Sequence, residues 1–105
     1  MGHTMEPLDR IDVINGKRYN TETATLLAGD DYWDGSNWER RGTNLFLFRT
    51  PKGAYFTQTR SQWQGSDDGA LSAVDDDEAQ RLFEGLREKR VTFEDAFPQV
   101  EIQDA

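Results

Sequence analysis

The side chains that carry nucleophilic catalysis are nearly absent from this chain of 105 residues. Cysteine is missing, and His3 is the single imidazole, within the segment Met1 to Thr4 that is either native or the remnant of an added tag before Met5. A serine nucleophile needs a neighbouring base to accept its proton. The sequence therefore predicts no catalytic triad, no thiolate metal site and no bound cofactor.

Carboxylates are plentiful, with 20 Asp and Glu, but they gather in loops and at a predicted helix start. Paired general acids and bases instead line an apolar cleft. Asp30, Asp34 and Gly35 match positions of a calcium loop, yet Tyr32 replaces an oxygen ligand and Arg41 replaces the closing glutamate. We therefore expect a protein that is not an enzyme and holds no metal; an enzyme with a carboxylate base would need a deep pocket lined by perturbed acids.

Aromatic and arginine residues in an otherwise polar loop form the first candidate binding surface. These residue types dominate the hot spots of protein interfaces. The candidates for partner binding are Tyr32, Trp33, Trp38, Arg40, Arg41 and Trp63, with Tyr55 on a neighbouring strand. Two alternatives stay open: the rings pack as the rim of a small core, or they stack on single-stranded nucleic acid. The acidic remainder of the chain disfavours the second alternative.

The acidic part of the chain forms the second candidate surface. Residues 1–60 hold eight acids and eight bases, whereas residues 61–105 hold twelve acids and four bases, so the net charge of -8 lies in the last part of the chain. Such a face repels duplex DNA and suits a basic protein. The residues of this acidic surface are Asp67, Asp68, Asp75, Asp76, Asp77, Glu84 and Glu88. The alternative explanation is adaptation to high salt or a high-GC genome, since Lys is scarce and Asp abundant.

A β-hairpin over residues 43–63 must position the aromatic group. Leu45 and Leu47 point to one face of its first strand and Phe46 and Phe48 to the other. A strand that is apolar on both faces is usually central in its sheet. The segment 50–53, Thr-Pro-Lys-Gly, supplies the turn, and a further strand over residues 70–74 would complete a three-stranded meander.

Helices are predicted on both sides of this meander. Asn20 or Thr21 can cap a short helix that ends at Gly29, because Ala24, Leu27 and Ala28 recur at helical spacing. Before it, the dipeptide Asn15-Gly16 predicts a tight hairpin turn.

After the meander, Asp75 or Asp76 caps a helix whose apolar face comprises Ala79, Leu82, Phe83 and Leu86. The segment 92–95 resembles a capping box and starts a short final helix.

The predicted fold class is α+β: a small antiparallel three-stranded β-meander with a short N-terminal helix and a C-terminal helix packed on the sheet. We expect residues 1–9 to be disordered or tag-like, residues 10–98 to form a single domain and residues 99–105 to form a frayed acidic tail. No window reaches the roughly 18 apolar residues of a membrane-spanning helix, and the lack of cysteine favours an intracellular, cytoplasmic location. We expect no membrane contact.

Three segments of the chain resemble a family of small uncharacterised proteins common on plasmids and prophages. They are residues 16–24, residues 45–50 together with residues 52–56, and the helix start Asp77-Glu78-Ala79. The resemblance covers roughly residues 15 to 97 and implies an α+β module with a meander and a covering helix, but no catalytic residue. We therefore predict a non-enzymatic protein-binding or regulatory module, possibly carried on a mobile element; the alternative is an acidic nucleic-acid mimic that inhibits a basic DNA-binding or defence protein.

Overall fold

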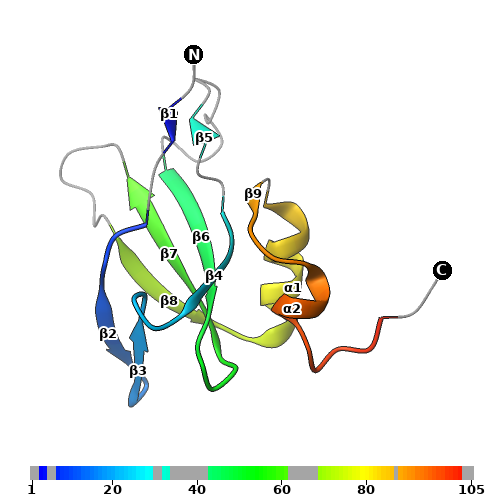
Figure 1. The fold of residues 1–105 in the computed structure, drawn as a ribbon. Helices are drawn as coiled ribbons and strands as arrows, with labels where there is room; N and C mark the ends of the chain where they lie inside the picture. Colours follow the sequence, from blue (N-terminus) through cyan, green and yellow to red (C-terminus); the bar gives the residue numbers. More distant parts are fainter. Residues whose placement is uncertain are drawn as a thin grey trace.

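The computed structural model describes residues 3–4, 7–29, 32–33, 43–61, 69–86 and 88–102. Figure 1 shows the arrangement of its elements. The strands are β1 (His3–Thr4), β2 (Ile11–Ile14), β3 (Lys17–Asn20), β4 (Thr25–Gly29), β5 (Tyr32–Trp33), β6 (Thr43–Arg49), β7 (Tyr55–Ser61), β8 (Ala70–Val74) and β9 (Glu88–Lys89). The helices are α1 (Asp76–Gly85) and α2 (Phe93–Ala96). Among these described residues, no helix is both long and apolar enough to cross a membrane.

The α+β class is confirmed, and the sheet is larger than predicted. Five strands pair in the order β8-β7-β6-β4-β9, and each neighbouring pair is antiparallel. The predicted meander forms β6, β7 and β8, but the prediction of only three strands is wrong because β4 and β9 extend the sheet beyond β6. Phe46 and Leu47, which point to opposite faces of β6, are both 0% exposed. β7 and β4 flank β6 within the sheet, and each of its two faces packs into a separate apolar core, as its apolar pattern predicts.

The predicted N-terminal helix is wrong: Asn20 ends β3, residues 21–24 form a turn and residues 25–29 form strand β4. Only one helical turn begins there, with the Ala24 amide donating to the Asn20 carbonyl at 3.1 Å. Thr21, Thr23 and Thr25 favour extended structure because their branched Cβ restricts side-chain rotation in a helix. A register shift between Leu26 and Ala28 places an extra residue opposite β6. This bulge, rather than helical periodicity, lets the consecutive residues Leu27 and Ala28 both be buried.

Each face of the sheet has its own apolar core, and Figure 1 shows what covers it. Helices α1 and α2 lie over one face, and the β2–β3 hairpin lies over the other. The core under the helices contains Leu27, Ala28, Leu47, Tyr55, Ala79, Phe83, Leu86, Ala96 and Phe97. The core under the hairpin contains Tyr19, Phe46, Phe48, Phe56 and Leu71. The predicted apolar face of α1 is thereby confirmed, with Leu82 packed at its edge.

Local signals set the ends of the elements as the sequence predicts. The Asp75 carboxylate accepts the Glu78 amide at 2.8 Å and caps α1, and the Thr92 hydroxyl accepts the Asp95 amide at 3.2 Å and caps α2. In the β2–β3 turn, Asn15 and Gly16 have φ of 52° and 77°. Positive φ at both central residues is the signature of the tight hairpin turn that Asn-Gly favours.

Candidate functional site

The structure removes Tyr55 from the predicted aromatic surface. Its side chain is 1% exposed, its hydroxyl donates to the Ala96 carbonyl at 2.7 Å, and its ring stacks on Phe97 at 5.0 Å. Tyr55 is therefore a core residue that ties β7 to α2.

Of the other candidates for partner binding, the structure describes only the backbone of Tyr32 and Trp33. Tyr32 and Trp33 form β5, whose backbone pairs with β1, and their side chains are not described. Trp38, Arg40, Arg41 and Trp63 lie outside the described residues. Binding by this group stays a prediction.

The predicted acidic surface divides into two groups. Asp75, Asp76 and Asp77 form the cap and first turn of α1 and are all exposed; we call these three residues the acidic helix start. Glu84 and Glu88 are exposed at the other end of α1 and on β9, whereas Asp67 and Asp68 lie outside the described residues.

Basic side chains lie among these acids. The guanidinium of Arg81 pairs with Glu78, and this hydrogen bond and the charge of Glu78 raise the pKa of Arg81 above its ordinary value. The Lys89 ammonium donates to the Leu86 carbonyl at 2.8 Å and lies 5.5 Å from the centre of the Phe83 ring. The acidic surface is therefore interrupted, and the acidic helix start is its most compact described part.

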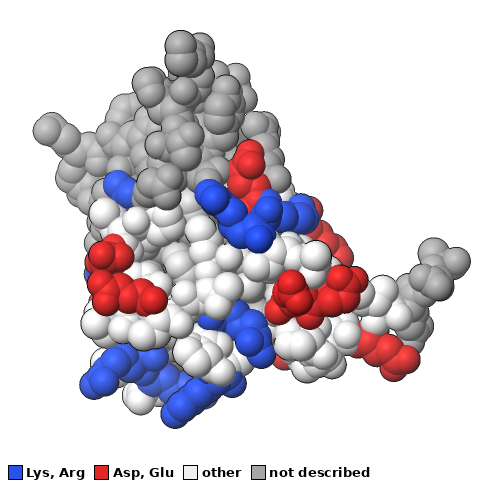
Figure 2. Space-filling view, viewed as in Figure 1, with Lys and Arg blue, Asp and Glu red and all other residues white. Residues whose placement is uncertain are grey.

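A groove of about 540 Å³ lies between the β2–β3 hairpin and the β6–β7 turn. We call it the basic groove. Its lining residues are Gly16, Lys17, Arg18, Tyr19, Asn20, Thr23, Thr50, Pro51, Lys52 and Ala54. Figure 2 shows Lys and Arg side chains gathered over this end of the molecule, in a chain whose net charge is -8.

The cations of the basic groove have no acidic partner among the described residues. The ion pairs of the described part of the chain join Arg10 to Asp12 and Arg81 to Glu78, so Lys17, Arg18 and Lys52 take no part in them. All three side chains are exposed. An unneutralised group of cations around a concave surface raises the local concentration of anions.

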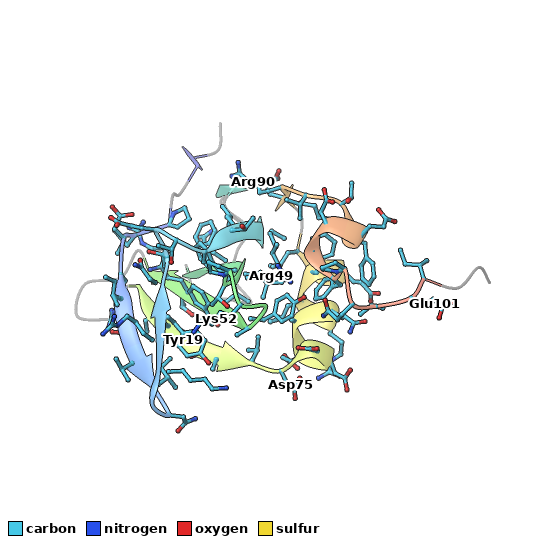
Figure 3. The ribbon with its side chains drawn as sticks, turned by 60° about the horizontal axis from the view of Figure 1, so that its bottom comes forward. Tyr19, Arg49, Lys52, Asp75, Arg90 and Glu101 are labelled. Atoms are coloured by element: carbon cyan, nitrogen blue, oxygen red, sulfur yellow. The ribbon has the colours of Figure 1, made fainter. Side chains whose placement is uncertain are left out.

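Arg49 adds a fourth positive charge beside the β6–β7 turn. Its Nη2 lies 3.4 Å from the position that a Cβ on Gly53 would take. Its Nε is buried and has no hydrogen-bond partner among the described groups. Figure 3 shows Arg49 near the centre of the view, with Lys52 nearer to Tyr19.

The wall made by the β6–β7 turn is held by its own hydrogen bonds. The Thr50 amide donates to the Ala54 carbonyl at 2.8 Å, and the Gly53 amide donates to the Thr50 carbonyl at 2.9 Å. The Thr50 hydroxyl accepts the Ala54 amide at 3.0 Å. Gly53 has φ of 91°, a conformation that favours glycine. The backbone that carries Lys52 is therefore well fixed.

The wall made by the β2–β3 hairpin is held by a ring contact with the sheet and by hydrogen bonds to the segment that precedes β2. Tyr19 is 6% exposed. Its ring packs edge to face with the ring of Phe56, and the two ring centroids lie 5.4 Å apart. Gln58 is fully buried, and its side-chain oxygen accepts a hydrogen bond from the backbone amide of Leu8 at 2.9 Å. Its side-chain nitrogen donates to the carbonyls of Leu8 at 2.9 Å and Gly69 at 3.2 Å. The Thr21 hydroxyl accepts the Arg10 amide at 2.8 Å. These contacts place the segment that leads into β2 against the sheet.

The acidic helix start and the basic groove lie at the same end of the molecule. Tyr55 pairs with Val74 across β7 and β8. Ala54, which precedes Tyr55, lines the groove, and Asp75 directly follows Val74. Figure 3 looks toward this end and shows Lys52 close to Tyr19, with Asp75 farther along the same side. Opposite charges are thus exposed at the same end of the molecule.

Sequence reasoning placed Lys52 in a turn, gave Lys17 and Arg18 no role in a site, and did not group the three residues. The available signal was local: each base adjoins a hairpin turn, in Gly16-Lys17-Arg18 and in Pro51-Lys52-Gly53. Comparison of the chain with protein-family models, with curated proteins and with solved structures finds no match. The function therefore has to be inferred from the geometry and charge of the groove.

Proposed function

We propose that this protein is a non-enzymatic binding module that holds an acidic segment of a protein partner in the basic groove. The observation that carries the proposal is the convergence of Lys17 and Arg18 with Lys52 on one groove, with no described carboxylate to pair with them. Asn20, Thr23 and Thr50 add neutral polar groups to the same lining. Such a surface offers charge-assisted hydrogen bonds to carboxylates.

The surroundings of the groove favour a short acidic segment over a long polyanion. A nucleic acid that extended past the groove would meet the exposed carboxylates of Asp75, Asp76 and Asp77. The net charge of -8 adds repulsion at longer range. A peptide with a few clustered acids can enter the groove without crossing the acidic helix start.

The ionisable groups of the lining suit binding rather than proton transfer. They are two lysines, one arginine and the buried phenol of Tyr19. General acid-base catalysis needs a group that gains and loses a proton near the operating pH. Three exposed cations instead supply positive charge, which supports a role in holding a partner.

The proposal is tested by fluorescence anisotropy with a labelled peptide of glutamates and a matched peptide of glutamines. We expect binding of the glutamate peptide only, weakening as salt rises because exposed charges are screened. Lys52→Glu reverses one charge of the groove and is expected to weaken binding about tenfold, or about 1.4 kcal/mol. Lys89→Glu is the matched control on β9 and is expected to leave the affinity within about twofold of wild type.

Equal binding of the two peptides, or equal losses in Lys52→Glu and Lys89→Glu, would contradict the proposal. The alternative function, an acidic mimic that binds a basic protein, is tested with an oligolysine probe. Binding of oligolysine without binding of oligoglutamate would support the acidic-mimic function, in which Asp75, Asp76, Asp77, Glu84 and Glu88 contact a basic protein.

A further inference from the structure

We infer that the partner that fits this end of the molecule is a second copy of the chain. In the inferred two-fold dimer, the basic groove of each copy meets the acidic helix start of the other. The inference rests on the proposed function, because it names the partner of the same groove.

The first step is that the two charged surfaces lie at the same end of the molecule but do not neutralise each other. The Asp75 carboxylate is occupied by the Glu78 amide. Asp76, Asp77 and Lys52 are exposed. None of the three takes part in the ion pairs of the described residues. Both surfaces are therefore available to another molecule.

The second step is symmetry. A partner that covers this end must present negative charge to the groove and positive charge to the acidic helix start, side by side. A copy turned by a two-fold rotation about an axis between the two surfaces presents this arrangement. Two-fold interfaces are self-complementary, so that a contact between residues i and j occurs twice. The groove lining carries three cations, and the acidic helix start carries three carboxylates of opposite charge.

The third step concerns how both surfaces are held in place. The capped α1 begins directly after β8, and Lys52 lies in the hydrogen-bonded turn before β7. Strands β7 and β8 are paired from Tyr55↔Val74 onward. The two charged surfaces therefore keep fixed positions relative to each other. Such fixed positions are required if both contacts of the dimer, each between a groove and a helix start, are to form at the same time.

The test exchanges the charges. One full-length variant carries Lys17→Glu and Lys52→Glu, and a second carries Asp76→Lys and Asp77→Lys; Asp75 is left in place because it caps α1. Circular dichroism checks that both remain folded. Sedimentation equilibrium at moderate and high salt then measures the dimer of the wild type, of each variant alone and of their equimolar mixture. In the mixture, the two variants carry different fluorophores.

We expect the wild type to dimerise at moderate salt, which screens the long-range repulsion between two chains of net charge -8. The dimer is expected to dissociate at high salt, because the contact is between exposed charges. Each variant alone is expected to dimerise at least about tenfold more weakly, since both contacts become like-charged. The mixture is expected to regain the wild-type affinity, because both contacts again pair opposite charges. Glu94→Lys with Asp95→Lys, an equal charge change in the first turn of α2, is the control and is expected to leave the dimer unchanged.

A wild type that stays monomeric, or a mixture that fails to restore dimerisation, would overturn the inference. The peptide assay of the proposed function separates the two conclusions. If the glutamate peptide binds wild type and not Lys52→Glu while no dimer forms, the groove binds another protein. If the dimer forms, the same peptide is expected to compete with it, and failure to compete would place the dimer contact outside the groove and so overturn the inference.

Discussion

Replacing Gln58 with leucine is expected to lower the free energy of unfolding by about 2 to 4 kcal/mol. Gln58 is 0% exposed and its amide makes hydrogen bonds to Leu8 N, Leu8 O and Gly69 O. Leucine fills a similar volume, so the change removes the hydrogen bonds without leaving a large cavity.

The magnitude follows from the groups left behind. Each ordinary hydrogen bond contributes about 1 kcal/mol, and a buried group left without a partner costs about 1 to 3 kcal/mol. Leu8 is 38% exposed, so water can reach part of that segment, whereas Gly69 is buried. The Gly69 carbonyl is therefore expected to account for the largest share.

Urea unfolding followed by circular dichroism measures the change. Gln58→Glu is the matched variant: it keeps an acceptor for the Leu8 amide but has no amide to donate to the two carbonyls. Because Gln58 holds the segment leading into the β2–β3 hairpin, Gln58→Leu is also expected to weaken binding of the glutamate peptide under conditions where the variant is folded. A loss of stability below about 0.5 kcal/mol, the usual range for surface substitutions, would refute this reasoning.

Two further predictions concern positions where one contact dominates. Gly29→Ala is expected to destabilise the fold by about 1 to 3 kcal/mol, because the new Cβ would lie 2.6 Å from Cδ1 of the fully buried Phe46; thermal unfolding measures the loss, and an unchanged melting temperature would show that Phe46 can move. Asp75→Ala is expected to cost about 1 kcal/mol by removing the cap of α1, whereas Asp76→Ala is expected to cost less; equal losses in chemical denaturation would count against the cap.

Much of the fold could be predicted because its signals are local. The alternation of Leu45, Phe46, Leu47 and Phe48 identifies a central strand, since period-two alternation assigns side chains to both faces. The Asn15-Gly16 turn and the caps of α1 and α2 depend on hydrogen bonds or dihedral angles within a few residues. A local rule is sufficient for such elements.

The segment 20–29 shows where local rules fail. Its spacing of Ala24, Leu27 and Ala28 fits a helix, but β6 offers an edge that β4 can join, and a bulge at Leu27 allows the apolar residues to be buried there. Tertiary pairing overrides a weak helical preference in this segment. The close approach of Gly29 to Phe46 is equally invisible in the sequence.

By itself, the sequence determined the α+β class, the central hairpin, the helix caps and the surplus of acids, because each depends on composition or on neighbours along the chain. Only the tertiary structure decided that Tyr55 is buried, that Gln58 bonds to Leu8, 50 residues away, and that Lys17 and Arg18 share a groove with Lys52. The physical reason is that a binding surface is assembled from separate turns. Their meeting is set by how the hairpin packs over the sheet, and no spacing along the chain records it.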